Sequence, residues 1–127
     1  MIGLPGPVQL ANANNPNRDG TTGTYSAPVV VGGGGARITA VSFQAITTTA
    51  AGTIRLFLSP DSGATWFMIF ESVTKAVTVS ATVPGTTAQY LPPSPFFLDV
   101  PASAQLRFTF SNNSETWNMT VQGVNNS

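Results

Sequence analysis

The stretch GTIRLFLSPDSGATWFMIFE, Gly52–Glu71, contains two runs of strand-forming residues separated by a turn. Pro60-Asp61-Ser62-Gly63 supplies the turn chemistry, because proline fixes φ, an aspartate side chain bonds nearby backbone groups and glycine accepts a positive φ. The two runs, Thr53–Leu58 and Thr65–Phe70, are therefore predicted to form a β-hairpin.

Both faces of this predicted hairpin are apolar. Side chains alternate along a strand, so with Ser59 opposite Ala64 one face is an ordinary core face. The second apolar set comprises Phe57, Trp66, Met68 and Phe70. A hairpin that is apolar on both sides needs a second layer or a partner to cover it. We expect this second set to be an interface, with the other sheet of the same domain as the alternative cover.

Composition favours a protein that works in an assembly. Only 8% of the 127 residues are charged, and five Lys and Arg balance five Asp and Glu. A neutral, charge-poor surface tends to self-associate. Nucleic-acid binding is not expected, because it needs a basic excess. No apolar run approaches the ~20 residues of a membrane span.

The side chains needed for catalysis or metal binding are scarce. The chain has no histidine and no cysteine, which removes the commonest general base and the commonest metal ligands. Its acidic residues lie in the N-terminal segment, in the central turn and at expected strand ends; they are Asp19, Asp61, Glu71, Asp99 and Glu115. No pair is expected to share a cleft, as a glycosidase requires. We expect no enzyme activity, no cofactor and no metal.

Alternating apolar residues predict an all-β fold. No stretch has the 3.6-residue apolar period of a helix. Further strands are predicted at 37–45, 73–83, 103–110 and 116–123, with the last two as a hairpin and 96–100 as a buried segment. Trp117 is in phase with Met119 and Val121 and is expected in the core. About eight short strands indicate an antiparallel β-sandwich, which we interpret as an eight-stranded jelly roll.

The N-terminal segment differs from the rest in composition. Residues 1–24 are rich in Gly, Pro, Asn and Thr, which predicts an extended arm or loop followed by a sandwich domain over 25–127. A poorly ordered terminus is one interpretation. The other is an arm that lies along a neighbouring subunit, with Val8 and Leu10 as its contacts.

The central turn resembles a known local motif. Ser59-Pro60-Asp61-Ser62-Gly63-Ala64-Thr65-Trp66 is similar to the Asp-box, S-x-D-x-G-x-T-W, of sialidases and other β-propellers. The resemblance implies a structural turn, in which Asp61 bonds backbone groups, Gly63 takes the turn conformation and Trp66 packs beneath. One box in a chain of this length does not predict a propeller, which repeats its blade several times.

A wider resemblance covers residues 36–123. The central hairpin, the run VTVSATVP and the closing LRFTFSNNSETWN resemble small capsid decoration, or cement, proteins of tailed bacteriophages. This resemblance implies a β-sandwich on the capsid surface of the virion that binds the major capsid protein and stabilises the shell. It also implies a homo-oligomer, for which we favour a trimer.

The alternative function is a carbohydrate- or receptor-binding module of a tail fibre or another virion appendage. Trp66, Trp117 and Tyr90 are the aromatic residues that could stack on a sugar. Such a site needs an exposed aromatic platform ringed by polar groups. The flanking Phe67 and Met68 make the surroundings of Trp66 too apolar for that role.

Overall fold

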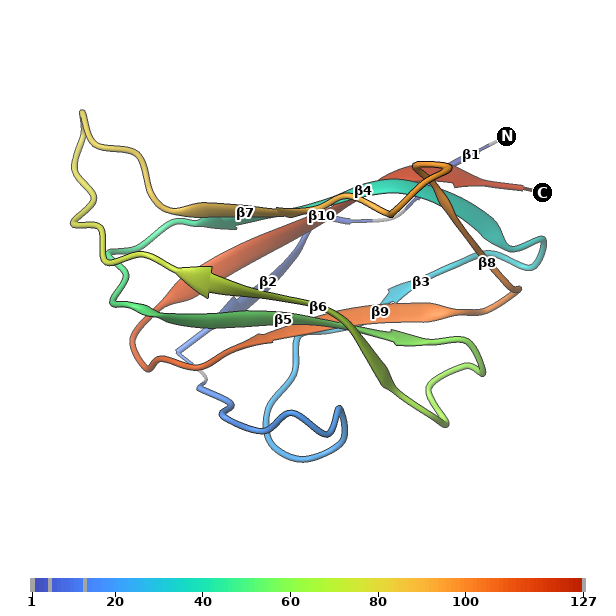
Figure 1. Ribbon diagram of the computed structural model, residues 1–127, viewed down its shortest axis with the longest axis horizontal. Coiled ribbons are helices and arrows are strands. Elements are labelled where there is room, and N and C mark those ends of the chain that lie inside the picture. Colours follow the sequence, from blue (N-terminus) through green and yellow to red (C-terminus); the bar gives the residue numbers. More distant parts are fainter. Residues whose placement is uncertain (1, 5, 13, 127) are drawn as a thin grey trace.

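A computed structural model describes residues 2–4, 6–12 and 14–126. Within these residues every regular element is a β-strand, and every pairing between strands is antiparallel. The strands form two sheets that pack face to face (Figure 1). The prediction of an all-β, antiparallel β-sandwich is therefore confirmed.

The described residues form ten strands, where the sequence predicts eight. The six-stranded sheet has the order β1–β10–β4–β7, with β2 also paired to β10 and β8 also paired to β4; the four-stranded sheet has the order β3–β9–β5–β6. The bounds are β1 Ile2–Gly3, β2 Val8–Ala11, β3 Val29–Val30, β4 Ala36–Ala45, β5 Gly52–Ser59, β6 Phe67–Thr74, β7 Thr87–Tyr90, β8 Leu98–Val100, β9 Gln105–Phe110 and β10 Thr116–Asn125.

One set of strand pairs is nested along the chain, and the pairs β4–β10 and β5–β9 join these nested pairs into the two sheets. β2 pairs with β10, β3 with β9, β4 with β7 and β8, and β5 with β6. The innermost pair is the hairpin predicted from the central stretch. β6 is the last strand of its sheet, so one of its two edges has no hydrogen-bonded strand among the described residues.

Inward-facing residues of both sheets build the core. Phe43 of β4 meets Phe108 of β9 edge to face, with ring centroids 5.6 Å apart. Trp117 is fully buried, as expected, and its Nε1 donates a hydrogen bond to Oε1 of Glu115 at 3.0 Å. The only polar atom of the buried indole is thus satisfied, so burying this large ring is favourable.

Two β-bulges reverse the expected alternation of faces. Ala40 and Ile38 oppose the consecutive residues Gln122 and Gly123, so Thr39 is an extra residue in β4. Ile38 and Phe43, which strict alternation would place on opposite faces, are consequently both in the core. A Cβ at Gly123 would lie 2.1 Å from the carbonyl oxygen of Arg37, so the close backbone approach at this bulge requires glycine.

The second bulge lies in β6. Leu56 pairs with Phe70 and Phe57 pairs with Met68, which leaves Ile69 as the extra residue. The register with Ser59 opposite Ala64 is therefore wrong. Phe70 shares the inner face with Leu56 and does not lie on the outer face with Phe57.

The predicted hairpin of residues 103–110 and 116–123 is also wrong. β9 pairs with β3 and β5, whereas β10 pairs with β1, β2 and β4, so these consecutive strands belong to opposite sheets. Each strand has one apolar side. In a sandwich, the apolar sides of strands in the two sheets pack against each other. The resulting alternation of apolar and polar residues is the same as in a hairpin, so the sequence pattern does not distinguish the two arrangements.

The predicted strand over 73–83 is mostly irregular. β6 ends at Thr74, and Val77 makes a single bridge to Thr49. Residues 75–86 extend beyond the end of the sandwich (Figure 1, yellow). β-branched residues favour a strand only where a partner strand is available, and the described chain places none beside this segment.

Candidate interaction surfaces

The outer face of the four-stranded sheet is covered by residues 14–26, which we call the strap. The strap lies beneath β5 and β9 in Figure 1. Its ends are fixed to β9, because the Asn15 and Ser26 amides donate hydrogen bonds to the carbonyl oxygens of Phe110 at 2.8 Å and Phe108 at 3.1 Å. The chain's own segment thus occupies the face for which the sequence predicts a partner.

Phe57 is covered directly by the strap and is fully buried. The Tyr25 ring meets it edge to face at 5.5 Å. Gly20, at φ 79°, rests on Phe57 and Trp66: a Cβ there would lie 3.1 Å from Phe57 Cδ1 and 3.0 Å from Trp66 Cβ. Phe57 therefore cannot contact a partner while the strap is in place.

Arg107 joins the strap to the sheet. Its guanidinium carbon lies 3.7 Å from the ring centroid of Tyr25 and 3.8 Å from that of Trp66, and its Nη2 donates to the carbonyl oxygen of Gly20. Burial lowers the pKa of the Arg107 guanidinium and raises the pKa of the Tyr25 hydroxyl. Trp66 is therefore half-buried beside a cation and does not offer a free ring to a sugar.

Glu71 forms the ionic part of the same contact. Its Oε2 accepts from Arg18 of the strap and from Nε of the buried Arg55 at 2.7 Å. The hydrogen bond from Arg55 is the main cause that lowers the pKa of Glu71. Arg55 Nη1 also donates to the carbonyl oxygen of Asn15 at 3.4 Å.

Asn15 and Asp19 set the shape of the strap. The fully buried Asn15 amide donates to the carbonyl oxygens of Thr22 and Thr24, both at 3.0 Å. Asp19 accepts from the Thr22 hydroxyl at 2.6 Å and from the amides of Thr21 and Thr22. The Thr22 hydroxyl is the first of the hydrogen bonds that lower the pKa of Asp19 to about 2.

Met68 and Phe70, also predicted as interface residues, separate in the structure. Met68 is half-buried on the outer face opposite Phe57. Phe70 faces inward, stacked on Phe43 at 6.1 Å and 5.6 Å from the ring of Tyr90. The predicted set of four therefore does not form one exposed surface.

The N-terminal segment is part of the sandwich and not a separate arm. Val8 and Leu10 lie in β2 opposite Met119 and Trp117 of β10. Leu10 is buried in the core and Val8 is half-buried against it. The expected boundary between residues 24 and 25 is thus not a structural division, and these two residues contact their own chain.

The central turn has a closed set of hydrogen bonds. Asp61 Oδ1 accepts from the Ser59 hydroxyl and from the Thr65 amide, both at 2.8 Å. Trp66 Nε1 donates to the carbonyl oxygen of Gly63 at 3.1 Å, and Gly63 has φ 96°. The Thr65 amide is the first cause that lowers the pKa of Asp61. The carboxylate is engaged in holding the turn.

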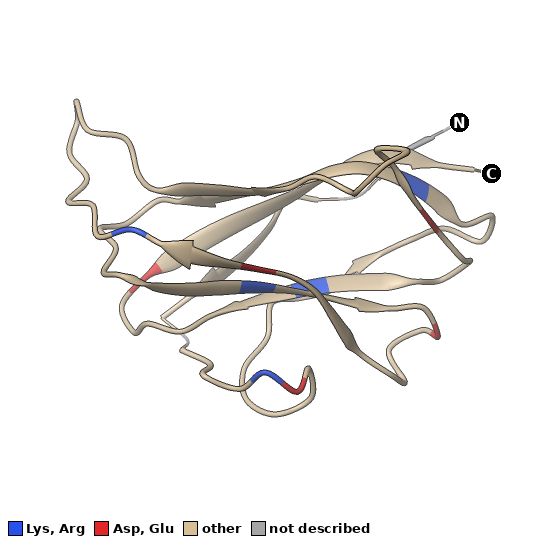
Figure 2. Ribbon diagram, viewed as in Figure 1, with Lys and Arg blue, Asp and Glu red and all other residues tan. Residues whose placement is uncertain are grey.

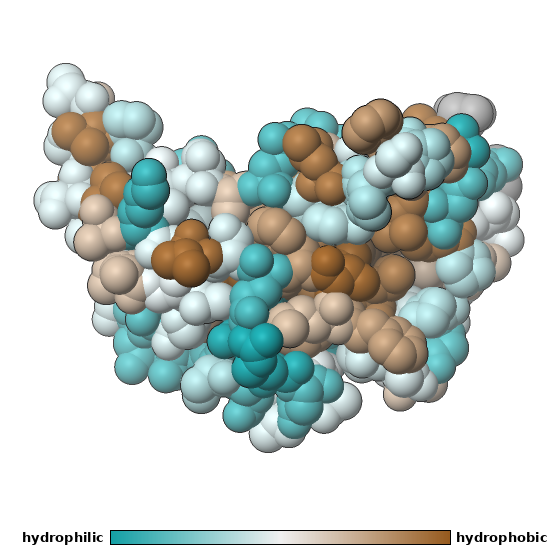
Figure 3. Space-filling model, in the orientation of Figure 1, coloured by the Kyte–Doolittle hydropathy of each residue, from teal (hydrophilic) through white to brown (hydrophobic). Residues whose placement is uncertain are grey.

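Exposed apolar side chains on the side of the sandwich that includes β6 and β7 were not predicted. Phe96 is 74% exposed, although the sequence predicts residues 96–100 to be buried, and Leu91 and Phe67 are 63% and 54% exposed. Figure 3 shows apolar side chains gathered on the face in view, which includes β6 and β7. The prolines at 92, 93 and 95 were the available signal, because they prevent regular pairing there.

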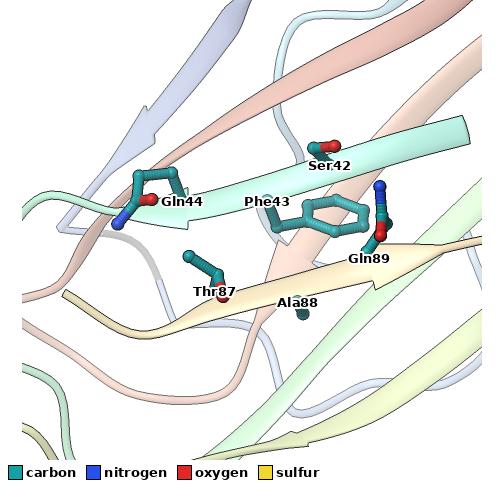
Figure 4. A pocket seen from close by; sticks show the side chains of 6 residues that line it. All are labelled: Ser42, Phe43, Gln44, Thr87, Ala88 and Gln89. Atoms are coloured by element: carbon teal, nitrogen blue, oxygen red, sulfur yellow. The ribbon is translucent and has the colours of Figure 1, made fainter. Parts of the chain in front are cut away.

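A hollow with both polar and apolar residues in its lining lies over β4 and β7. It has a volume of about 360 Å³ and is lined by Ser42, Phe43, Gln44, Thr87, Ala88 and Gln89. Cross-strand pairing sets Ser42 opposite Gln89 and Gln44 opposite Thr87 (Figure 4). The polar side chains thus offer amides and hydroxyls, and none of them is charged. The alternation of apolar and polar residues along these strands predicts a solvent-facing side of the sheet, but it does not predict a hollow there.

Comparison with known proteins gives no family. A scan against models of protein families finds none that matches the chain. A search of curated proteins likewise finds no match.

The residues that the structure describes contain no helix long and apolar enough to cross a membrane. They also contain no group of three His, Cys, Asp or Glu side chains placed to hold a metal ion.

Proposed function

We propose that this protein is a non-enzymatic component of a tailed-bacteriophage virion that binds the capsid surface and stabilises the assembled shell as a cement protein. The proposed partner is the major capsid protein of the same virion. One observation carries the proposal: Phe96, Leu91 and Phe67 stay exposed although the sandwich has a complete core of its own. Large exposed apolar side chains, gathered on one face of the molecule as in Figure 3, are typical of a protein-binding site.

Phe96 is the strongest candidate contact in this surface. It has φ 74°, a conformation that is costly for a bulky side chain, by roughly 1–3 kcal/mol. Its ring is largely exposed, so packing within the chain offsets little of that cost. A partner that buries the ring would account for both features.

The proposed fold for this role is a jelly roll. β1 and β2 count as two pieces of one edge strand because both pair with β10, and β7 and β8 likewise because both pair with β4. Eight strands remain, of which the first pairs with the last and each next pair lies inside the previous one. This nesting supports a jelly roll, in which two Greek keys wrap around one core.

Binding to heads tests the function directly. Heads lacking the protein, from the phage that encodes it, are mixed with purified protein and sedimented. We expect saturable binding and a higher temperature of head disruption, because a ligand of the assembled state stabilises that state. Phe96→Ser and Leu91→Ser should weaken binding, whereas Val83→Ser, a change at another exposed apolar residue, should not. Absence of wild-type binding would overturn the proposal.

A second candidate function is recognition of a neutral glycan by the hollow over β4 and β7, as part of a tail fibre or another appendage. Its uncharged amides and hydroxyls can donate to and accept from sugar hydroxyls. A glycan array with labelled protein tests it: hits that Gln44→Ala and Gln89→Ala abolish would support it, and an empty array would rule against it.

The proposed cement protein is a homo-oligomer on the shell, and the trimer favoured by the resemblance is the state to be tested against a dimer. Closed symmetry would place the same apolar surface of every copy against the lattice.

A further inference from the structure

We propose that two copies of this chain associate through the free edge of β6, as antiparallel strands related by a twofold axis. The four-stranded sheets of the two copies would join into one continuous sheet. This inference concerns contact between copies and does not depend on capsid binding.

The edge is available for pairing. β6 is the last strand in the order β3–β9–β5–β6, and an unprotected edge strand is a template for another strand. The bulge at Ile69 distorts the first half of β6, and bulges disfavour pairing. The regular half is Phe70–Thr74, so pairing is expected about Val73, with Lys75, the residue that follows the strand, at the end of the contact.

Val73 lies at the centre of the proposed contact. It is 81% exposed, more than any other large apolar side chain of the described chain. It pairs with Thr53 of β5 on the same face on which Glu71 pairs with Arg55. A twofold axis at Val73 would bury it against Val73 of the second copy.

Charges select this register. With the axis at Val73, residues n and 146 − n oppose each other, so Glu71 faces Lys75 of the second copy and Lys75 faces its Glu71. Lys75 is the one cation among the described residues with no ion pair, side-chain hydrogen bond or aromatic contact. Both arginine bonds to Glu71 end on Oε2, which leaves Oε1 for the lysine. A register centred on Glu71 would instead oppose two carboxylates, which is unfavourable.

Cross-linking tests the register. The chain has no cysteine, so a single introduced thiol can form a disulfide only between copies. At about 100 µM, a concentration suited to a small and weak interface, Val73→Cys should form covalent dimers at least ~10-fold faster than Val30→Cys, because pairing raises the effective thiol concentration. Val30 is the matched control, an exposed valine on β3 at the opposite edge of the same sheet.

Sedimentation equilibrium tests the association itself. Wild type should dimerise, and Val73→Asp should be monomeric. Lys75→Glu should raise the dimer dissociation constant about tenfold, since it opposes like charges at both ends of the contact. Wild type that stays monomeric up to ~1 mM, where even weak interfaces are populated, would overturn the proposal. So would equal cross-linking of the two cysteine variants, or an oligomer that Val73→Asp leaves intact.

Discussion

The two outer faces of the sandwich differ in whether another part of the chain covers them. The four-stranded sheet presents Phe57 and Trp66 outward, and the strap covers them with Arg18, Arg55, Glu71 and Arg107 around the contact (Figure 2). The six-stranded sheet presents amides and hydroxyls such as Gln44, Thr87 and Gln89, and the hollow on it is open. Three of the five Lys and Arg residues thus serve one face.

The difference shows how a chain with few charges buries the apolar side chains that its core does not hold. Uncharged polar side chains are solvated by water, so their face needs no cover. Aromatic side chains favour removal from water, and a segment without a core of its own becomes ordered by covering them. The composition that predicts an arm reaching a neighbour equally suits a strap that folds back.

The sharpest test of this comparison is Phe57→Ala. If the strap seals the outer face as a core does, the variant should lose about 3–5 kcal/mol of unfolding free energy. Thr120→Ala, at an exposed position of β10, should lose about 1 kcal/mol or less. Urea unfolding measures both. A loss at Phe57 no larger than that at Thr120 would mean that the strap does not exclude water.

A smaller effect is expected for Asn15→Ala. The variant leaves the carbonyl oxygens of Thr22 and Thr24 without their donor, which should cost about 1–3 kcal/mol and speed amide exchange across the strap. Gln9→Ala is the control: it removes an exposed hydrogen bond between Gln9 and Asn118, both in the six-stranded sheet, which the strap does not cover. It should change the free energy of unfolding by about 0.5 kcal/mol or less. Unchanged exchange in the strap of the Asn15 variant would contradict its anchoring role.

The smallest expected effect is in acid. The pKa of Glu71 is lower in the folded protein than its ordinary 4.5, so its ion pairs contribute stability above that value and lose it as pH falls through the folded pKa. Glu71→Gln should therefore flatten the fall in stability below about pH 4.5. Urea unfolding between pH 7 and pH 2 measures the slope. Parallel curves for variant and wild type would contradict a folding-linked shift at Glu71.

The sequence predicts most strands and misplaces the faces near two bulges. Alternation identifies β4, β5, β9 and β10, because burying one side of a strand leaves a period of two. It cannot reveal Thr39 or Ile69 as extra residues, since a bulge is a feature of backbone pairing and not of side-chain type. From each bulge onward the predicted faces are therefore exchanged, which is why Phe70 was assigned to the wrong side.

The cover over the predicted interface residues was missed for a different physical reason. Phe57 and Trp66 do lie on a second apolar face, as the hairpin pattern indicates. Their cover depends on Gly20 fitting against the Phe57 ring and Cβ of Trp66, which are far from it in sequence. It also depends on the Asn15 side chain closing the loop of the strap. Exposure of Phe96 likewise depends on the path of the 91–97 loop, which hydrophobicity alone does not predict.

Nested pairing also has a kinetic consequence. Among the strands that the structure describes, only β5 and β6 are both adjacent in sequence and paired. A hairpin of this size closes in about 1–10 µs. β4, β3 and β2 find their partners progressively later in the chain, so we expect folding to proceed outward from the central hairpin. During synthesis on a ribosome, Leu10 emerges long before its pairing partner Trp117. Until Trp117 has emerged, the amino-terminal third of the protein would depend on chaperones or on rapid synthesis to avoid pairing with strands of other chains.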